Sequence, residues 1–472
     1  GNGSDGVQVV GASATGNLLK GNHIGVDAAG TAVVPNGSAG VRLQADASGN
    51  TVGGTGAGNL IRGNKGPGVV LTGAGSNRIS RNAIWGNGQI GIDLADNGVS
   101  VNDGAKTSGQ PNQLMDQPVL TAARVRGDQL AVTGHVGSAA GQSLFAGASV
   151  EVFTSDASSS GHGGGQAWLG TLTADGNGNF QGTLTMPVAS LALGARLTAT
   201  ATDGSGNSSE FGPNFSNLVV DFVVDTTADD ADQTPGDGQC LTAAGLCSLR
   251  AAITELNTWA SLATTPAVAF ALPGCSAAGQ AACSIAPVTA LPTVARAMTI
   301  DGRTQPGWNG STATPLVELN GATAPANAIG LVVNTGGFTL RGLVVNRWGS
   351  HGLSLGGSGN TVAGNWFGVA ATGSTAAGNG GNGIDVTGTS HQIGGSTLTD
   401  RNVASGNGGS GIALKGSGNT VTGNLAGLLP DGLGTAGNGG DGIYASAANQ
   451  TIGGSAGKGN VASANKVSGI RL

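Results

Sequence analysis

Acidic side chains that could act on a polysaccharide are few in this chain. Asp93 and Asp96 stand close together at the end of a repeated segment. Paired carboxylates supply the acid and the base, or the nucleophile, of glycoside hydrolysis. Asp385 has no acidic counterpart one repeat later, where Ala413 stands. The scarcity of paired acids predicts that the protein is not an enzyme, and a carbohydrate-cleaving protein is the alternative hypothesis.

Aromatic residues offer a second route to carbohydrate chemistry. Trp348, Trp366 and Phe367 are close enough in sequence to form a strip on which sugar rings could stack, and core or turn positions are the alternative. The histidines occupy unlike positions in the repeat, at His23, His351 and His391, which argues against a shared catalytic function. A carbohydrate-binding protein is therefore kept beside the carbohydrate-cleaving one as an alternative function.

A cluster of acids near the middle of the chain suggests calcium, the one cofactor that the sequence indicates. The candidate ligands are Asp229, Asp230, Asp232 and Asp237. Carboxylate oxygens are the ligands that Ca²⁺ prefers, but these acids do not follow the spacing of an EF-hand loop. A solvated acidic loop is the alternative interpretation.

The cysteines favour an oxidising location. All four lie in one region, at Cys240, Cys247, Cys275 and Cys283. Four cysteines allow three pairings, and the short separations favour Cys240–Cys247 and Cys275–Cys283. Disulfides are typical of extracytoplasmic proteins, whereas the spacing matches no common zinc site. Four reduced thiols are the alternative.

Most of the chain that positions these residues consists of sequence repeats. The anchor Gly-Ile/Val-x-Leu/Val/Ala recurs at intervals of 31, 28, 31 and 27 residues from Gly352, Gly383, Gly411, Gly442 and Gly469. It recurs earlier at intervals of 34, 28 and 23 residues from Gly6, Gly40, Gly68 and Gly91. Such a period indicates a solenoid, whose units bury their apolar faces only by stacking.

A second motif, Asn-x-apolar-x-x-Asn, lies inside each repeat. It begins at Asn17, Asn59, Asn77, Asn360, Asn402, Asn419 and Asn460. The apolar residue between the two asparagines has strand spacing, and Asn and Gly allow sharp turns. Two or three short strands fit into each repeat. Both arrays are therefore predicted to be parallel β-helices, with asparagine side chains bonding up the stack.

The region between the arrays reads differently. Residues 119–219 carry about seven short alternating runs separated by turns, which predicts an immunoglobulin-like β-sandwich. Residues 248–257 form the best helix candidate, with Ser248 as the N-cap and an apolar stripe at Leu249, Ala252, Ile253 and Leu256. We expect this helix to cover the open end of the array that follows.

Composition excludes several classes. The 472 residues include 90 glycines, 10 % are charged, 3 % are aromatic and the net charge is −6. The sequence has no basic run for nucleic acid and no 18-residue apolar run for a membrane span. Helical repeats would not tolerate so much glycine.

One segment carries a family resemblance. Cys247-Ser-Leu-Arg250-Ala-Ala252, with the preceding Val223-Val-Asp-Thr-Thr-Ala-Asp229, resembles the CSLREA domain of bacterial surface proteins. The segment starting Ile300-Asp-Gly-Arg is similar to the right-handed parallel β-helix that follows that domain. Ala251 departs from the family pattern, which has Glu there. The resemblance implies a secreted surface protein and supplies no catalytic residue.

The resulting domain prediction has four parts. They are the C-terminal part of a parallel β-helix (1–118), an immunoglobulin-like sandwich (119–219), a CSLREA-type cap region with the first coils (220–323) and a parallel β-helix (324–472).

This order of domains suggests two successive surface units, each cut through its β-helix. Completing a coil between Leu472 and a following Gly1 would need 22 residues. We therefore expect an extracellular structural or adhesive repeat protein, assembled head to tail with itself as a stalk or filament. A surface glycan or cell-surface receptor is the further partner expected.

Overall fold

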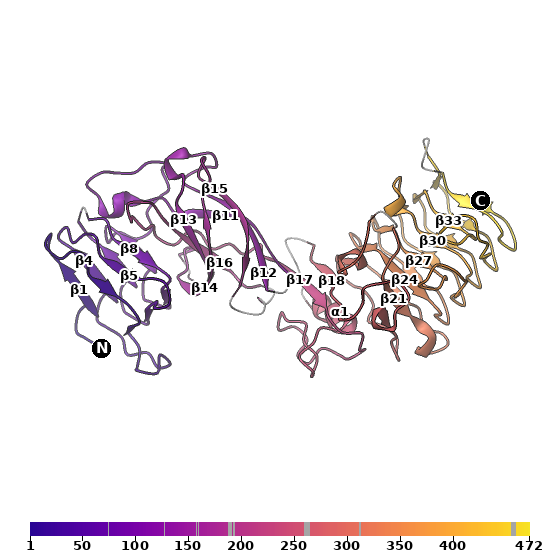
Figure 1. Cartoon of the computed structure of the whole chain (residues 1–472), viewed down its shortest axis with the longest axis horizontal. Helices are drawn as coiled ribbons and strands as arrows, with labels where there is room; N and C mark the ends of the chain where they lie inside the picture. Colours follow the sequence, from indigo (N-terminus) through magenta and orange to yellow (C-terminus); the bar gives the residue numbers. More distant parts are fainter. Residues whose placement is uncertain are drawn as a thin grey trace. The chain divides into compact units, whose positions relative to one another are not determined.

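The computed structural model describes the chain except residues 74, 127, 157, 159, 187–190, 192–193, 259–264, 311–312 and 455–458. It has two compact units, Gly1–Val220 and Asp221–Leu472, each built mainly of β-strands (Figure 1).

The first unit begins with a stack of short parallel strands, which we call the N-terminal stack. Each turn of the chain adds one strand to each of three sheets. The first sheet holds β1 (Val7–Val10), β4 (Val41–Gln44), β7 (Val69–Leu71) and β10 (Ile92–Leu94). The second holds β2 (Leu18–Leu19), β5 (Thr51–Gly53) and β8 (Arg78–Ser80), and the third β3 (His23–Ile24), β6 (Leu60–Arg62) and β9 (Ala83–Trp85). This pattern is compatible with the predicted β-helix.

Two antiparallel sheets complete the first unit. One holds β11 (Pro118–Arg126), β12 (Gln129–Val136) and β15 (Asn179–Thr185), and the other β13 (Ser149–Ser155), β14 (Gly165–Thr173) and β16 (Leu197–Thr202). A short 3₁₀ turn lies at Ser143–Phe145, and the turn at Pro111–Leu114 has left-handed backbone at Asn112, Gln113 and Leu114. The described residues between β11 and β16 thus contain six strands where about seven were expected, and the immunoglobulin-like classification stays a prediction.

The second unit contains the C-terminal stack, again of three parallel sheets. The first sheet runs through β17 (Val219–Val224), β18 (Ala267–Phe270), β20 (Thr299–Asp301), β23 (Thr339–Arg341), β26 (Thr361–Ala363), β29 (Gln392–Gly394), β32 (Thr420–Thr422) and β35 (Thr451–Ile452). The second runs through β19 (Ser284–Ile285), β21 (Val317–Asn320), β24 (Leu343–Asn346), β27 (Trp366–Phe367), β30 (Val403–Ala404), β33 (Leu425–Ala426) and β36 (Val461–Ala462). The third runs through β22 (Leu331–Val333), β25 (Leu353–Leu355), β28 (Ile384–Val386), β31 (Ile412–Leu414), β34 (Ile443–Ala445) and β37 (Ile470–Arg471).

Stacking in register makes the core of the C-terminal stack. Ile384 pairs with Ile412, and Ile412 pairs with Ile443 in the next turn, so equivalent side chains form a continuous row. Ten of the eleven predicted inward positions are fully buried, namely Leu353, Leu355, Val362, Ile384, Val386, Ile393, Ile412, Leu414, Val421 and Ile443. Ile452 stacks on Val421 as predicted but is only half-buried, because β35 is the last strand of its sheet.

The anchor glycine is explained by close contact between turns. A Cβ atom on Gly383 would lie 2.7 Å from the carbonyl oxygen of Gly411, and one on Gly411 would lie 2.7 Å from that of Gly442. Contacts this short are essentially never made by real Cβ atoms. Glycine therefore lets the parallel strands approach one another where each anchor begins.

Asparagines form ladders at the corners of both stacks. The backbone N–H of Asn365 donates to Oδ1 of Asn402 at 3.0 Å, and Nδ2 of Asn402 donates to Oδ1 of Asn424 at 2.9 Å. In the N-terminal stack the N–H of Asn59 donates to Oδ1 of Asn82 at 3.0 Å in the same way. Each ladder satisfies buried backbone groups at a corner that no strand pairing reaches.

One rung of a ladder is a histidine. The N–H of Asn360 donates to Nδ1 of His391 at 3.0 Å, and the N–H of His391 donates to Oδ1 of Asn419 at 2.9 Å. His391 is 1 % exposed, and its Nε2 has no hydrogen-bond partner among the described residues. Burial lowers the pKa of His391 to about 4. The ring is therefore neutral, with its proton on Nε2.

Each stack is covered at one end. Helix α1 (Leu249–Thr258) begins after Ser248, whose Oγ accepts from the N–H of Ala251 at 3.0 Å, as the predicted N-cap should. The helix contacts β18 and buries its predicted apolar stripe, Leu249, Ala252, Ile253 and Leu256 (Figure 1). The helix lies at the end of the C-terminal stack where its first strands are, which agrees with the expected covering role.

The antiparallel sheets cover the far end of the N-terminal stack. Phe153 and Phe211 belong to the same apolar core as the stacked strands, and their rings meet edge to face at 5.5 Å. Ser208 Oγ accepts from the N–H of Ile79 on β8 at 2.8 Å, and Glu151 accepts from the N–H of Arg81 at 2.8 Å. The last turn of the stack is thus shielded from water.

Loss of an interior rung should destabilise the C-terminal stack. Asn402→Ala removes the acceptor for Asn365 and the donor to the Val362 carbonyl oxygen and to Asn424. Leaving these buried groups without partners should lower the free energy of unfolding by about 2–4 kcal/mol in urea titrations. Asn334→Ala, at an exposed position of the same unit, is the control and should change little. An equal effect of the two substitutions would contradict the ladder argument.

Stability should also depend on pH through His391. Because its pKa is lower in the folded chain, the unfolded state binds more protons between about pH 6.5 and pH 4. The contribution of neutral His391 to the free energy of unfolding of the second unit should therefore be fully present above about pH 6.5. That free energy should fall by about 2–3 kcal/mol as the pH drops to about 4.

His391→Asn restores the usual rung and should remove that loss. Urea unfolding at pH 7 and pH 4.5 would measure it, with His351→Asn as the control, since His351 accepts a similar hydrogen bond from Asn382 but is only half-buried. An unchanged pH dependence in His391→Asn would show that His391 is not the sensitive group.

Candidate functional site

A cavity of about 920 Å³ opens in the first unit, where the N-terminal stack meets the antiparallel sheets. Its walls come from the turn between β9 and β10, the turn after β10 and the loop between β13 and β14. Most of the side chains that line it are polar or aromatic, with Ile90 and Val99 as apolar members. The polar and aromatic ones are Trp85, Asn87, Gln89, Asp93, Asp96, Asn97, Asp156, Ser158, Ser160 and His162.

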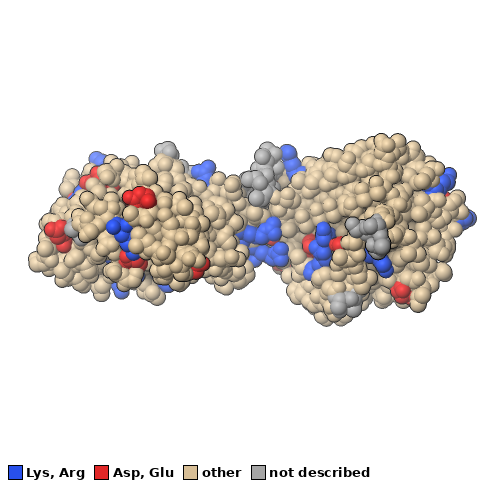
Figure 2. Space-filling model, turned by 90° about the horizontal axis from the view of Figure 1, so that it is seen from above, with Lys and Arg blue, Asp and Glu red and all other residues tan. Residues whose placement is uncertain are grey.

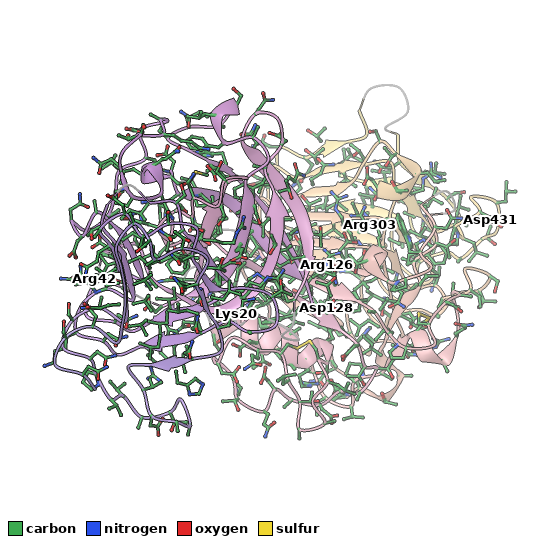
Figure 3. All side chains as sticks on the ribbon, turned by 60° about the vertical axis from the view of Figure 1, so that its left-hand side comes forward. Lys20, Arg42, Arg126, Asp128, Arg303 and Asp431 are labelled. Carbon is green, nitrogen blue, oxygen red and sulfur yellow. A yellow bond between two sulfur atoms is a disulfide. The ribbon has the colours of Figure 1, made fainter. Side chains whose placement is uncertain are left out.

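The two acids that the sequence singled out both line this cavity. Asp93 is buried on β10, and its two oxygens accept from the N–H groups of Asn97 and Gly98 at 3.0 and 3.1 Å. Burial raises the pKa of Asp93, the backbone hydrogen bonds oppose that rise, and repulsion from Asp96 adds to it. Asp96 is exposed, and one of its oxygens is 3.0 Å from a guanidinium nitrogen of Arg42 (labelled in Figure 3).

Two further carboxylates, which the sequence did not single out, fix the walls. Asp156 accepts from the N–H of Gly86 in the stack and from that of Gly164 in the sheet loop, both at 2.8 Å. Glu210 is buried and accepts from the N–H groups of Leu94 and Ser100, both at 2.8 Å. Burial raises the pKa of Glu210 to about 7, against the lowering effect of these hydrogen bonds. Sequence spacing carried no signal for the contacts with Gly86, Leu94 and Ser100, because these partners are 70, 116 and 110 residues away from the carboxylates.

The proposed aromatic strip is wrong. Trp348 is 1 % exposed, Trp366 5 % and Phe367 0 %, so none offers a face to a ligand. The indole N–H of Trp348 donates to the Leu319 carbonyl oxygen at 3.2 Å, inside the C-terminal stack. Phe367 packs against the anchor glycines, whereas Trp366, its neighbour on β27, packs in a separate apolar cluster with Val344 and Val403. All three rings therefore occupy core positions, which was the alternative interpretation.

The remaining single candidates are also structural. Asp385 pairs in register with Ala413, as the repeat alignment expected, and is 2.7 Å from the ammonium group of Lys415. His23 lies on an outer strand, β3, of the N-terminal stack, far along the chain from the two histidines of the C-terminal stack. These positions give neither Asp385 nor His23 a part in a catalytic centre.

The predicted calcium ligands do not converge. Asp229 forms an ion pair with Arg250 at 2.8 Å, and Arg250 also donates to the Thr289 and Ala290 carbonyl oxygens. Asp232 and Asp237 each accept from a backbone N–H two residues further on, in local turns. In the part of the chain that the structure describes, no three His, Cys, Asp or Glu side chains are placed to hold a metal ion. The geometry therefore gives the calcium hypothesis no support.

Both disulfides have the pairing that the spacing favours, Cys240–Cys247 and Cys275–Cys283. The first lies directly before α1, and the second precedes β19. Their local loops hold the irregular segments that flank the first strands of the C-terminal stack.

Charged side chains are sparse on the face that Figure 2 draws, in keeping with a sequence in which 10 % of residues are charged. Figure 2 shows Lys, Arg, Asp and Glu side chains singly or in small groups on each unit, with most of the surface free of them. None of the described helices is long and apolar enough to span a membrane.

No protein-family model matches this sequence. The similarity to the CSLREA domain therefore remains a prediction from the residues quoted above.

Loss of either disulfide should destabilise the second unit. The bridges span 7 and 8 residues, and closing loops of this size should contribute about 2–3 kcal/mol each. Replacing both cysteines of one pair by serine should lower the free energy of unfolding by that amount in denaturant titrations without reductant. Dithiothreitol should destabilise the wild type and leave a variant without both pairs unchanged. Equal stability of oxidised and reduced wild type would contradict the stabilising role.

Proposed function

We propose that the protein is an extracellular structural repeat protein in which the stacks of successive repeats continue into one another to form a surface stalk or filament. In this proposal the two stacks are right-handed parallel β-helices, the antiparallel sheets are an immunoglobulin-like sandwich, and the region around α1 is a CSLREA-type cap. The protein acts as a shaft and has no hydrolase or lyase activity.

The supporting observation is that each stack has one covered end and one open face. The open face of the N-terminal stack, which we call the N face, consists of β1, β2 and β3, each the outermost strand of its sheet. On it Val10 is 51 % exposed and Leu18 64 %. The open face of the C-terminal stack, the C face, consists of β35, β36 and β37, where Val461 is 45 % and Ile470 46 % exposed. Unpaired strands with exposed apolar side chains are templates for further pairing.

The asparagine ladders make the two faces complementary. In the ladders whose rungs are asparagines on successive turns, an N–H group donates toward the turn that follows in the chain, as from Asn17 to Asn50 and from Asn438 to Asn465. The row through His351, Asn382 and Ser410 is the exception, because its N–H groups donate toward the preceding turn. Within the described residues, no group donates to the side-chain oxygens of Asn2, Asn17 and Asn22 at the N face. At the C face, the N–H groups of Asn460 and Asn465 likewise have no acceptor in the described part of the chain.

This polarity favours head-to-tail stacking. The C face presents donors and the N face presents acceptors, while parallel pairing requires the same strand direction across the junction. A contact between two different faces does not close on itself and so extends in one direction. The adjoining turn belongs either to the same polypeptide or to another copy.

Other features agree with a shaft outside the cytoplasm. Two disulfides tie the second unit, and such bonds persist in oxidising compartments. The acids offered for catalysis have structural partners, since both oxygens of Asp93 accept backbone N–H groups. A surface with few charged groups suits a shaft that does not adhere along its length.

The C face provides the test of association between separate copies. Val461→Asp with Ile470→Asp should place two charges at the junction and weaken concentration-dependent association at least tenfold in sedimentation velocity experiments. Leu433→Asp, at a position that is 85 % exposed in a loop of the same unit, should associate like the wild type.

Electron microscopy of the native material tests the covalent form, which should appear as long shafts. Chains that stay monomeric at millimolar concentration would exclude docking between copies, and native material seen as discrete particles would exclude the covalent shaft.

A further inference from the structure

Hydrogen bonds to carboxylates join the segments that form the walls of the cavity in the first unit. Asp156 joins the N-terminal stack to the sheet loop through hydrogen bonds from Gly86 and Gly164. Glu210 joins the end of β10 to the segment after it through Leu94 and Ser100. A cavity whose walls are joined by hydrogen-bonded carboxylates, Asp156 half-buried and Glu210 buried, is formed before any ligand arrives, so binding requires little ordering of the chain.

Some polar groups of the cavity already have hydrogen-bond partners within the described residues, and others have none there. Both oxygens of Asp156 and both of Asp93 already accept backbone N–H groups. Within the described residues, by contrast, the side-chain amides of Gln89 and Asn97 make no hydrogen bond, and both residues are exposed. His162 uses Nδ1 toward the Phe211 carbonyl oxygen at 3.1 Å, and its Nε2 has no partner in the described part of the chain.

An aromatic ring stands beside these free groups. Trp85, at the end of β9, lines the cavity and is half-buried. The guanidinium of Arg62 lies over its ring at 4.0 Å from the centroid, which fixes the orientation of the indole. A held indole next to free amides presents an apolar face and hydrogen-bonding groups to the same ligand.

The charge of the lining restricts the ligand class. Asp93, Asp96 and Asp156 line the cavity, and no Lys or Arg is among the described residues that do so. Arg42 pairs with Asp96 and Arg62 lies over Trp85, so these cations are already engaged, and the remaining carboxylates favour a ligand without acidic groups. A metal ion is disfavoured, because no three potential ligands are placed together in the described residues.

We propose that this cavity binds a short oligosaccharide without acidic groups. A volume of about 920 Å³ lies at the upper end of the range for small-ligand sites, which suits several linked sugar rings. Trp85 packs against one sugar ring, Gln89 and Asn97 hydrogen-bond to hydroxyl groups, and Nε2 of His162 offers a further contact. The three carboxylates exclude uronic acids. The inference concerns the first unit alone and does not depend on head-to-tail stacking.

Calorimetry with the whole 472-residue chain tests the proposal. Maltotriose, cellotriose, mannotriose and tri-N-acetylchitotriose are the neutral probes, and trigalacturonic acid is the acidic one. At least one neutral probe should bind, and Trp85→Ala should weaken its binding at least tenfold. The double variant Gln89→Ala with Asn97→Ala should do the same, and because both side chains are exposed it should keep the stability of the wild type.

Matched controls lie outside the cavity. Trp308→Ala removes another half-buried indole that carries a guanidinium neighbour, Arg303, and Asn177→Ala removes another exposed turn amide. Both should bind as the wild type does. The proposal is overturned if no neutral probe binds, if trigalacturonic acid binds as tightly as the best neutral probe, or if the double variant binds with unchanged affinity.

Discussion

The structure depends on one constraint: no turn of either stack can satisfy its own interior. A turn of two or three short strands leaves apolar side chains and corner N–H groups that only the next turn covers. Ile384 is buried because Leu353 and Ile412 lie on either side of it, and Asn402 bonds in both directions along its ladder. Stability is therefore a sum over neighbouring turns, and each end of a stack is a defect that needs a cover.

The covers at the two described ends use different chemistry. At the start of the C-terminal stack, α1 supplies an apolar stripe, and disulfides hold the irregular chain around it. At the end of the N-terminal stack, antiparallel sheets supply Phe153 and Phe211 for the core and carboxylates for unpaired N–H groups. Carboxylates suit this task because a charged acceptor makes a stronger hydrogen bond to a backbone donor than a neutral one does.

The cavity follows from the same covering arrangement. The sheet loop that supplies Asp156 to Gly86 does not lie flat against the turns around β10, and space remains between them. Asp93 and Asp156 accept backbone N–H groups of the wall segments and also line the cavity, which gives its walls negative charge. Structural fastening and ligand selectivity are thus linked: the groups that hold the cavity open also decide which charge it rejects.

The sequence by itself determined the repeat, the inward row and the local pairs. The period placed Ile384, Ile412 and Ile443 in one row, and short separations favoured both disulfides, because these features depend on neighbours one turn or a few residues away. Ser248 was likewise readable as a helix cap, since the hydrogen bond it makes is local. Only the tertiary structure buried Trp348 and Trp366, spread the acids near Asp229 among separate partners, and brought Asp156 and Glu210 to the end of the N-terminal stack. Those outcomes depend on which distant segment covers which surface, and a linear pattern carries no record of contacts across 70 to 116 residues.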